Sequence, residues 1–208
     1  MEIVEPQVII EQPRSFIGVC RNLELYGRVA YKSEDMITPL SAEKFLKGLI
    51  KSGHESVLEH ESISVRFICD RGVTHELVRH RLAAYTQEST RYCNYSKLGM
   101  QVIRPCFWEA GSPEYTTWLT TMQHAERAYN LLISNGASPQ EARSILPNSL
   151  KTEIVATMNI REWRHVLRLR TSPAAHPQMR QVMTMLLCIL KFKLPTLFDD
   201  IQHTSLKE

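Results

Sequence analysis

Hydrophobic and polar residues alternate along residues 61–70 (ESISVRFICD), where Ile63, Val65 and Phe67 share one face. A period of two residues is typical of a strand with one buried face. Residues 100–104 (MQVIR) are few and rich in strand-favouring types, and residues 150–158 (LKTEIVATM) also alternate. The pattern predicts strands over the first two segments, and over the third it favours a strand with a helix as a competitor.

Serine-proline pairs mark the starts of two predicted helices. The pair at 112–113 opens a helix that Gly136 can end, because glycine readily adopts the left-handed conformation that follows a helix. The pair at 138–139 opens another helix, and Glu141 stands three residues after the serine. This spacing is that of a capping box, in which serine and glutamate satisfy each other's backbone N–H groups.

The C-terminal third of the chain predicts two further helices. Asn159 with Glu162 repeats the capping pattern ahead of a helix to about Arg170, and an apolar helix runs from about 177 to 192. The elements together predict an α+β fold in a single domain over residues 1–208. Its mixed or antiparallel sheet would be backed by long helices.

Composition narrows the class of protein. The 208 residues suffice for a full core, and 43% hydrophobic and 23% charged residues are ordinary for a globular protein. A formal charge of +3 is too small to indicate a nucleic-acid or membrane partner. The N-terminal apolar run is too short for a signal peptide, and no stretch approaches the roughly 20 apolar residues of a membrane span. We expect a cytoplasmic protein without nucleic-acid or membrane partners.

The five cysteines are scattered and are never spaced C-x-x-C. This arrangement fits a reducing cytoplasm and argues against a disulfide framework or a cysteine zinc site. Their positions are Cys20, Cys69, Cys93, Cys106 and Cys188.

Residues 73–92 (VTHELVRHRLAAYTQESTRY) begin like the helix of a zinc protease, with His75 and Glu76 followed by His80. Zinc-protease histidines stand four residues apart, which brings both rings to one helix face. Five steps of ~100° separate these two by roughly 140°, so a regular helix cannot aim both at one ion. The sequence therefore predicts no metal site.

The rest of that segment indicates an anionic ligand. On a continued helix, residues 79–81 (RHR) would fan over about 200° and reach different parts of a large ligand. Gln87, Glu88, Ser89 and Arg91 then add an amide, a carboxylate, a hydroxyl and a guanidinium. Guanidinium and hydroxyl groups suit a phosphate, while an amide or carboxylate can bind a pyrimidine edge.

At this point the segment resembles the flavin-dependent thymidylate synthases, whose signature is R-H-R-x-x-S-x-N-x-x-S-x-R. Residues 79–91 carry it with matching spacing, but Ala84 and Thr86 stand where the signature has serine and asparagine. Ala84 lacks the hydroxyl, so no role is assigned to it. Thr86 keeps a polar group but not the amide.

Three further segments carry the resemblance in the family's order. Residues 53–60 (GHESVLEH) look like its GHE[ST]-x-x-EH segment. Asn159, Arg161 and the L-R-L-R run at 167–170 look like its N-x-R…L-x-L-R helix, and Arg143 precedes Asn159 by sixteen residues, where the family has a nucleotide-binding arginine. The resemblance covers about residues 53 to 180.

The resemblance implies a fold, a reaction and an assembly. The family fold is an α+β subunit in a homotetramer, with active sites at subunit interfaces that each hold FAD. The implied reaction is methylation of dUMP to dTMP. 5,10-Methylenetetrahydrofolate supplies the carbon, reduced flavin supplies the hydride, and NADPH re-reduces the flavin. No enzyme cysteine adds to the uracil ring.

The resemblance also assigns roles to residues. Arg170 is the catalytic candidate, because a guanidinium beside uracil N3 favours the ionised ring. It ends the apolar stripe of Trp163, Val166 and Leu167, whereas Arg161 and His165, with Arg164 and Arg168, lie roughly opposite. The dUMP residues are Glu76, Arg79, Gln87, Glu88, Ser89, Arg91, Arg143 and Arg170. The FAD residues are His54, Ser56, Arg79, His80, Arg81, Gln87, Asn159, Arg161 and His165.

Three alternatives stay open at this point. A basic nucleic-acid-binding module would use a phosphate stripe of Arg161, Arg164, Arg168 and Arg170. A non-catalytic relative would bind FAD or nucleotide only, a possibility that Ala84 and Thr86 keep open. A cysteine-dependent methyltransferase would use Cys106, which follows a proline, or Cys93 beside the phosphate segment; nothing nearby is obviously placed to activate Cys93.

Overall fold

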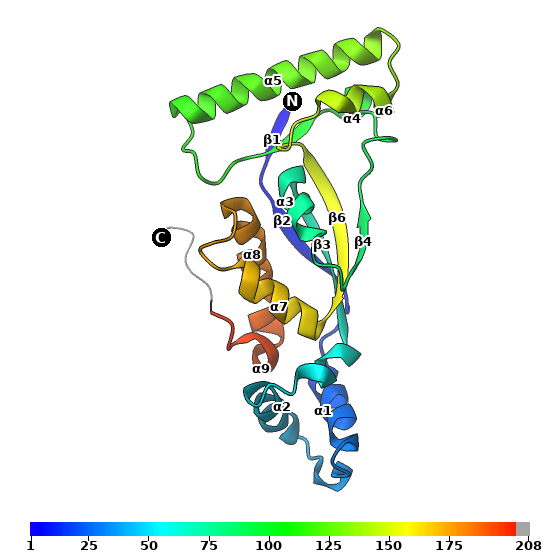
Figure 1. The fold of residues 1–208 in the computed structure, drawn as a ribbon, viewed down its shortest axis with the longest axis vertical. Coiled ribbons are helices and arrows are strands. Elements are labelled where there is room, and N and C mark those ends of the chain that lie inside the picture. Colours follow the sequence, from blue (N-terminus) through cyan, green and yellow to red (C-terminus); the bar gives the residue numbers. More distant parts are fainter. Residues whose placement is uncertain (203–208) are drawn as a thin grey trace. The chain divides into compact units, whose positions relative to one another are not determined.

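A computed structural model of the chain describes residues 1–202 (Figure 1). It is an α+β fold, as predicted. The elements are β1 (Glu2–Val4), β2 (Gln7–Gln12), α1 (Val19–Val29), η1 (Glu34–Met36), α2 (Ser41–Lys51), η2 (Glu55–His60), β3 (Ser62–Asp70), α3 (Arg71–Leu77), β4 (Ala84–Gln87), α4 (Tyr95–Leu98), β5 (Gln101–Ile103), α5 (Pro113–Ser134), α6 (Pro139–Ala142), η3 (Arg143–Ile145), β6 (Lys151–Asn159), α7 (Ile160–Arg170), α8 (Pro177–Lys193) and α9 (Pro195–Phe198).

The chain forms two compact units, each built from several segments that alternate along the sequence. The first unit comprises residues 1–8, 66–80 and 85–155, and the described residues of the second are 9–65, 81–84 and 156–202. Strands β3 and β6 contribute residues to both units. The single domain expected from the sequence stays a prediction.

Strands β3 and β6 are central in a four-stranded sheet of order β2-β3-β6-β4. Residues at every second position are buried on both, as the hydrophobic pattern predicts for β3. Residues 151–159 form a strand, which decides between the strand and the helix that the sequence left in competition. On the opposite face the Ser64 and Thr157 hydroxyls lie 2.7 Å apart, and Arg66 pairs with Glu153 at 3.0 Å. These pairings run in opposite directions along the two strands, so β3 and β6 are antiparallel.

The first unit holds the long helix α5, with α4 and α6 beside it (Figure 1). The Ser112 hydroxyl accepts the Tyr115 backbone N–H at 3.1 Å, and Gly136 follows the helix with φ +96°. The Ser138–Glu141 capping box is present at α6. Both helix starts predicted from serine-proline pairs are therefore confirmed. A second, two-stranded sheet pairs β1 with β5 in parallel, which confirms the short strand expected at 100–104.

The second unit holds the paired helices α1 and α2 and the group α7, α8 and α9 (Figure 1). Helix α7 begins after Asn159, whose side-chain oxygen accepts the Glu162 backbone N–H at 2.8 Å, as its capping pattern predicts. Helix α8 ends at Lys193, one residue past the prediction. At the close contact between α1 and α2, a Cβ added to Gly27 would lie 2.7 Å from the Phe45 ring. Glycine is therefore the residue that this contact accommodates.

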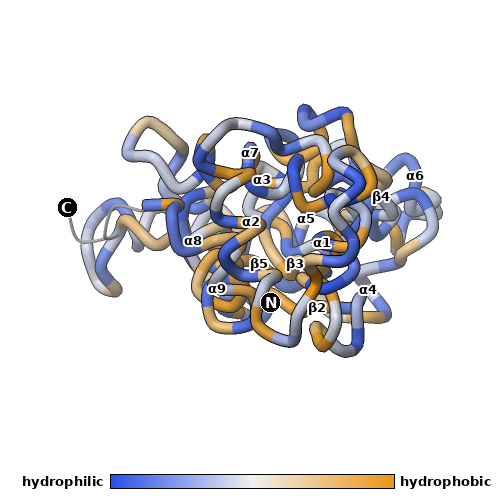
Figure 2. The backbone as a smooth tube through the Cα atoms, turned by 90° about the horizontal axis from the view of Figure 1, so that it is seen from below, coloured by the Kyte–Doolittle hydropathy of each residue, from blue (hydrophilic) through white to orange (hydrophobic). Residues whose placement is uncertain are grey.

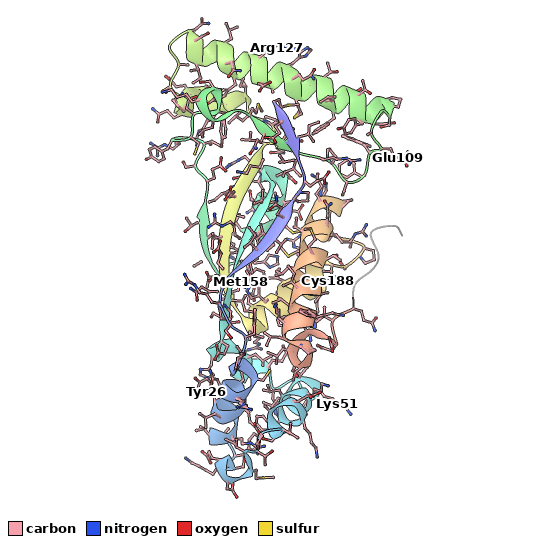
Figure 3. All side chains as sticks on the ribbon, turned by 180° about the vertical axis from the view of Figure 1, so that it is seen from behind. Tyr26, Lys51, Glu109, Arg127, Met158 and Cys188 are labelled. Atoms are coloured by element: carbon pink, nitrogen blue, oxygen red, sulfur yellow. The ribbon has the colours of Figure 1, made fainter. Side chains whose placement is uncertain are left out.

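Hydrophobic and hydrophilic positions interleave along the backbone (Figure 2). In keeping with this, none of the helices within residues 1–202 is long and apolar enough to cross a membrane. Cys188 lies exposed on α8 and Met158 lies near the end of β6 (Figure 3).

Helix α3 corrects one expectation. It ends at Leu77, so residues 79–81 do not fan around a helix, and the angle that separated His75 from His80 does not apply. The cause is Tyr85, whose hydroxyl lies 2.7 Å from both the Leu77 and the His80 carbonyl oxygens. The Tyr85 hydroxyl thereby supplies these carbonyl oxygens with a hydrogen-bonding group from outside the helix. After Leu77 the chain forms a tight turn, in which the His80 N–H donates to the Leu77 carbonyl oxygen.

Candidate functional site

The turn after α3 separates the three residues of the RHR run by exposure. Arg79 is exposed, His80 is 7% exposed, and Arg81 is exposed in the second unit. Glu76 lies half-buried near the end of α3. The turn therefore presents a guanidinium to solvent and holds the imidazole inside, instead of spreading both around a helix.

Gln87 ends strand β4 and Glu88 follows it, and both side chains form hydrogen bonds. The Gln87 amide nitrogen lies 3.0 Å from the Thr74 hydroxyl on α3 and 3.3 Å from the Thr152 hydroxyl on β6. The Glu88 carboxylate accepts the Tyr95 hydroxyl at 2.7 Å and pairs with Lys151 at 3.4 Å. The contact between Gln87 and Thr74 holds α3, which carries Glu76, beside the end of β4. The residues predicted to bind the phosphate follow that strand end.

Lys151 joins these residues in a charge network on the first unit. Its ammonium lies 2.9 Å from Glu153, which pairs in turn with Arg66. Burial opposes the charge of Lys151, but the hydrogen bond and charge of Glu153, with those of Glu88, outweigh it and raise the Lys151 pKa. The Glu153 pKa is lowered, chiefly by the hydrogen bond from Lys151. Burial, and then the hydrogen bond to Glu88, raise the Tyr95 pKa, which favours the protonated hydroxyl that donates a hydrogen bond to Glu88.

Ser89 and Arg91, whose hydroxyl and guanidinium groups were predicted to bind the phosphate, follow Glu88 directly in the sequence. The Ser89 hydroxyl accepts the Arg91 backbone N–H at 3.3 Å, and the exposed Arg91 guanidinium lies 5.4 Å from the centre of the Tyr92 ring. Arg143 is exposed at the start of η3, immediately after the capped helix α6. The capping box fixes the start of α6, and with it the backbone position of Arg143, which follows that helix.

In the second unit, η2 packs against α7 and brings together two segments that carry the resemblance. The Arg161 guanidinium donates to the Glu59 carboxylate, which joins the GHESVLEH segment to the N-x-R helix. His54 and Ser56 are exposed at the start of η2. Asn159 cannot move freely, because its side chain caps α7.

A surface pocket of about 580 Å³ lies at this junction. Its lining includes three of the residues expected to bind FAD. Arg170 is not part of that lining, as expected for a residue nine positions from Arg161 on the same helix. The residues that line it are Glu55, Glu59, Leu82, Asn159, Arg161, Glu162, His165 and Arg168.

Arg164 corrects the expected division of α7 into two faces. Its side chain is 0% exposed, although the helical spacing placed it with Arg161, His165 and Arg168. It pairs with Glu55 at 3.2 Å and with Asp200 at 2.8 Å, and it donates to the Leu197 carbonyl oxygen. These partners satisfy the guanidinium inside the protein, which is the condition for burying a charge.

The pairing of Arg164 also removes the basic stripe considered from the sequence. Arg168 pairs with the same two carboxylates as Arg164, and Arg161 pairs with Glu59. Three of the four arginines proposed for a phosphate stripe are therefore neutralised by acidic side chains. This arrangement does not favour a nucleic-acid surface.

Arg170 is the last residue of α7 and is half-buried. The next residue, Thr171, is buried and both its hydroxyl and its backbone N–H donate to the Leu167 carbonyl, at 2.8 and 3.0 Å. The end of the helix is thereby fixed, and with it the position of the Arg170 backbone.

The residues that sequence reasoning missed are the partners of the predicted ones. Thr74, Thr152 and Lys151 hold Gln87 or Glu88, and Tyr85 ends α3. Tyr85 lies inside the signature and could have been singled out there. The others could not, because a lone threonine or lysine in a strand or helix carries no signal of its partner.

Comparisons with known proteins identify the family to which the chain belongs. The family model described as "Thymidylate synthase complementing protein" matches residues 18–196. A flavin-dependent thymidylate synthase of Geobacter sulfurreducens is 34% identical over 183 residues, which are 85% of this chain and 79% of that protein. One from Pyrococcus furiosus is 33% identical over 175 residues, covering 83% of this chain and 72% of that protein.

A solved structure shares the fold. The crystal structure of the UMP/dUMP methylase PolB from Streptomyces cacaoi, bound with 5-Br dUMP, superposes with a TM-score of 0.79 over 96% of both chains at 22% identity. The chain belongs to the family of flavin-dependent thymidylate synthases.

Proposed function

We propose that this protein is a flavin-dependent thymidylate synthase that methylates dUMP to dTMP. 5,10-Methylenetetrahydrofolate would supply the carbon, and bound FAD, re-reduced by NADPH, would supply the hydride. The observation that carries the proposal is the match over residues 18–196 together with the signature at 79–91. Gln87, which lies within the signature, ends strand β4, and its amide nitrogen lies 3.0 Å from the Thr74 hydroxyl on α3, a contact that joins the two elements.

The dUMP phosphate is assigned to the cationic and hydroxyl groups of the first unit. Arg79, Arg91 and Arg143 are exposed guanidiniums, and Ser89 adds a hydroxyl. A guanidinium pairs with phosphate oxygens through two parallel hydrogen bonds, which a lysine cannot reproduce. Glu76 and Gln87 suit the sugar or base, and Glu88 supports the segment through Tyr95 and Lys151.

The lining of the pocket beside α7 fits part of FAD. Arg161 and Arg168 offer cations for a diphosphate, while Asn159 and His165 offer neutral polar groups. Because each arginine is ion-paired with a carboxylate, a bound diphosphate would share or replace Glu59, Glu55 or Asp200. His54, Ser56, Arg79, His80, Arg81 and Gln87 complete the proposed FAD set.

Arg170 is the proposed catalytic residue. Its charge near uracil N3 would stabilise the ionised ring and make C5 electron-rich enough to attack the methylene group. No cysteine is needed for this step. Cys69 is buried and burial raises its pKa, which disfavours the thiolate that a nucleophile requires.

We further propose a cytoplasmic homotetramer with active sites at subunit interfaces, acting on small molecules and not on nucleic acid or membranes. The proposal of a single domain over residues 1–208 belongs with it. A non-catalytic relative that binds FAD or nucleotide is the second candidate function. Ala84 and Thr86, the two departures from the signature, favour it and both are exposed on β4.

The visible absorption spectrum of the purified protein tests the cofactor directly. We expect flavin bands, retained through gel filtration after incubation with FAD and bleached on addition of NADPH without oxygen. Heat-denatured protein, treated in the same way, is the control for unbound flavin. A folded protein that stays colourless after incubation with FAD would contradict the proposal.

A further inference from the structure

The orientation of the Gln87 amide is fixed by two threonines that are not among the proposed ligand-binding residues. Gln87 Nε2 lies 3.0 Å from Thr74 Oγ1 and 3.3 Å from Thr152 Oγ1. Both threonines are fully buried, whereas Gln87 is only half-buried. One end of the amide therefore points toward buried hydroxyls, and the other end is available to a ligand.

The hydrogen of the Thr74 hydroxyl decides which end points inward. That hydroxyl donates to the Arg71 carbonyl oxygen at 2.9 Å, so its oxygen is left as an acceptor. With the amide NH₂ inward, Gln87 donates to both threonines and Thr74 keeps its bond to Arg71. With the amide reversed, Thr74 would have to turn its one proton from Arg71 to Gln87, or leave two oxygens facing each other. The first arrangement makes three hydrogen bonds and the second makes two, so the NH₂ group lies inward.

The consequence is that Gln87 presents an acceptor. Within residues 1–202, its carbonyl oxygen Oε1 accepts no hydrogen bond. We propose that Thr74 and Thr152 are positioning residues that hold Gln87 Oε1 ready to accept a hydrogen bond from the pyrimidine nucleotide. The inference rests on the proposed function, and it specifies the chemistry of one contact within it.

An acceptor restricts what Gln87 can bind. An ionised phosphate offers no hydrogen to Oε1, and neither do the carbonyl oxygens of uracil. The donors of dUMP, before its ring ionises, are the N3–H group of the base and the 3′-hydroxyl of the sugar. Gln87 therefore reads one of these donors, and the arginines and Ser89 are left for the phosphate. Because the side chain is already fixed before binding, less side-chain freedom is lost when the ligand arrives.

Affinity for dUMP in five variants of the FAD-loaded protein tests the positioning role. Thr74→Val, which keeps the shape but removes the hydroxyl, is expected to raise the Kd for dUMP about 3- to 10-fold. Thr152→Val should also raise the Kd for dUMP. Thr74→Ser, which keeps the hydroxyl, should bind dUMP like the wild type. In a Gln87→Leu background, Thr74→Val should have no further effect, because the group that it positions is gone. Unfolding midpoints check that each variant is folded.

Two analogues identify the donor. The ratio of Kd values for Gln87→Leu and wild type is measured with dUMP, with N3-methyl-dUMP and with 2′,3′-dideoxyuridine monophosphate. We expect the ratio to fall to about 1 for the analogue that lacks the donor and to persist for the other. A ratio that persists for both analogues would show that Gln87 Oε1 accepts a hydrogen bond from neither donor, and would overturn the inference.

The outcomes separate this inference from the proposed function. Wild-type protein that does not bind dUMP would overturn both. Wild-type protein that binds dUMP, but in which Thr74→Val and Thr152→Val leave the Kd unchanged, would overturn the positioning role alone. The same holds if Thr74→Val weakens binding equally with and without Gln87.

Discussion

Replacing Arg170 with alanine is expected to lower the turnover of dUMP by more than about 100-fold at saturating dUMP. The guanidinium is the charge proposed to stabilise the ionised uracil ring, and alanine leaves nothing in its place. Arg170→Lys keeps the charge but loses the planar fork, so we expect partial activity. The measurement is the rate of dTMP formation with folate, FAD and NADPH present.

The matched control for Arg170 is the double variant Cys93→Ser, Cys106→Ser. Cys93 is half-buried and Cys106 is exposed, so serine is tolerated at both positions. We expect this variant to retain turnover, because the proposed reaction uses no thiol nucleophile. Near-normal turnover in Arg170→Ala would contradict its catalytic role. Complete loss of turnover in the folded double cysteine variant would instead indicate a covalent mechanism.

Replacing Arg164 with alanine is expected to lower the free energy of unfolding by about 3 kcal/mol or more. The change leaves Glu55 without its buried partner and the Leu197 carbonyl without its donor. For a chain of this size, that loss corresponds to a fall in Tm of about 6–12 °C. Thermal unfolding followed by circular dichroism measures it.

Arg168→Ala is the control for Arg164, because Arg168 pairs with the same carboxylates but is 45% exposed. A pair in solvent contributes little, so the expected loss is within about 1 kcal/mol. Equal losses of unfolding free energy in Arg164→Ala and Arg168→Ala would contradict the claim that burial of Arg164 makes its ion pairs the more stabilising.

The Arg164 effect should also depend on pH. Burial alone would raise the pKa of Asp200, but the hydrogen bonds and charges of Arg164 and then Arg168 lower it below its ordinary value of 3.8. A carboxyl with a lowered pKa stabilises the fold fully above its unfolded pKa and loses that contribution as the pH falls through the folded pKa. The difference between wild type and Arg164→Ala should therefore be constant near neutral pH and shrink below about pH 4.

The sequence predicted the fold best where local chemistry decides the structure. Alternation defined β3, and the serine and asparagine caps placed α5, α6 and α7, because capping depends on residues that are three positions apart. The end of α3 was not predictable in this way. It depends on the Tyr85 hydroxyl reaching back to Leu77 and His80, a contact that no helical periodicity contains.

The burial of Arg164 could not be predicted from the sequence either, because it also depends on contacts that no local pattern contains. Helical spacing placed it among charged residues, and only its partners Glu55 and Asp200, far away in the chain, explain why it is buried. The candidate site shows the same limit. Its charged and amide residues were proposed from a signature, whereas Thr74 and Thr152, which orient Gln87, become visible only when α3, β4 and β6 are brought together.

Release of tritium from dUMP labelled at C5 tests the central claim most directly, because methylation at C5 displaces that hydrogen. With FAD, NADPH and 5,10-methylenetetrahydrofolate present, we predict continuous tritium release accompanied by dTMP. Omission of the folate should abolish dTMP formation. A folded, FAD-loaded protein that releases no tritium and forms no dTMP would contradict the claim and would identify the chain as a non-catalytic relative.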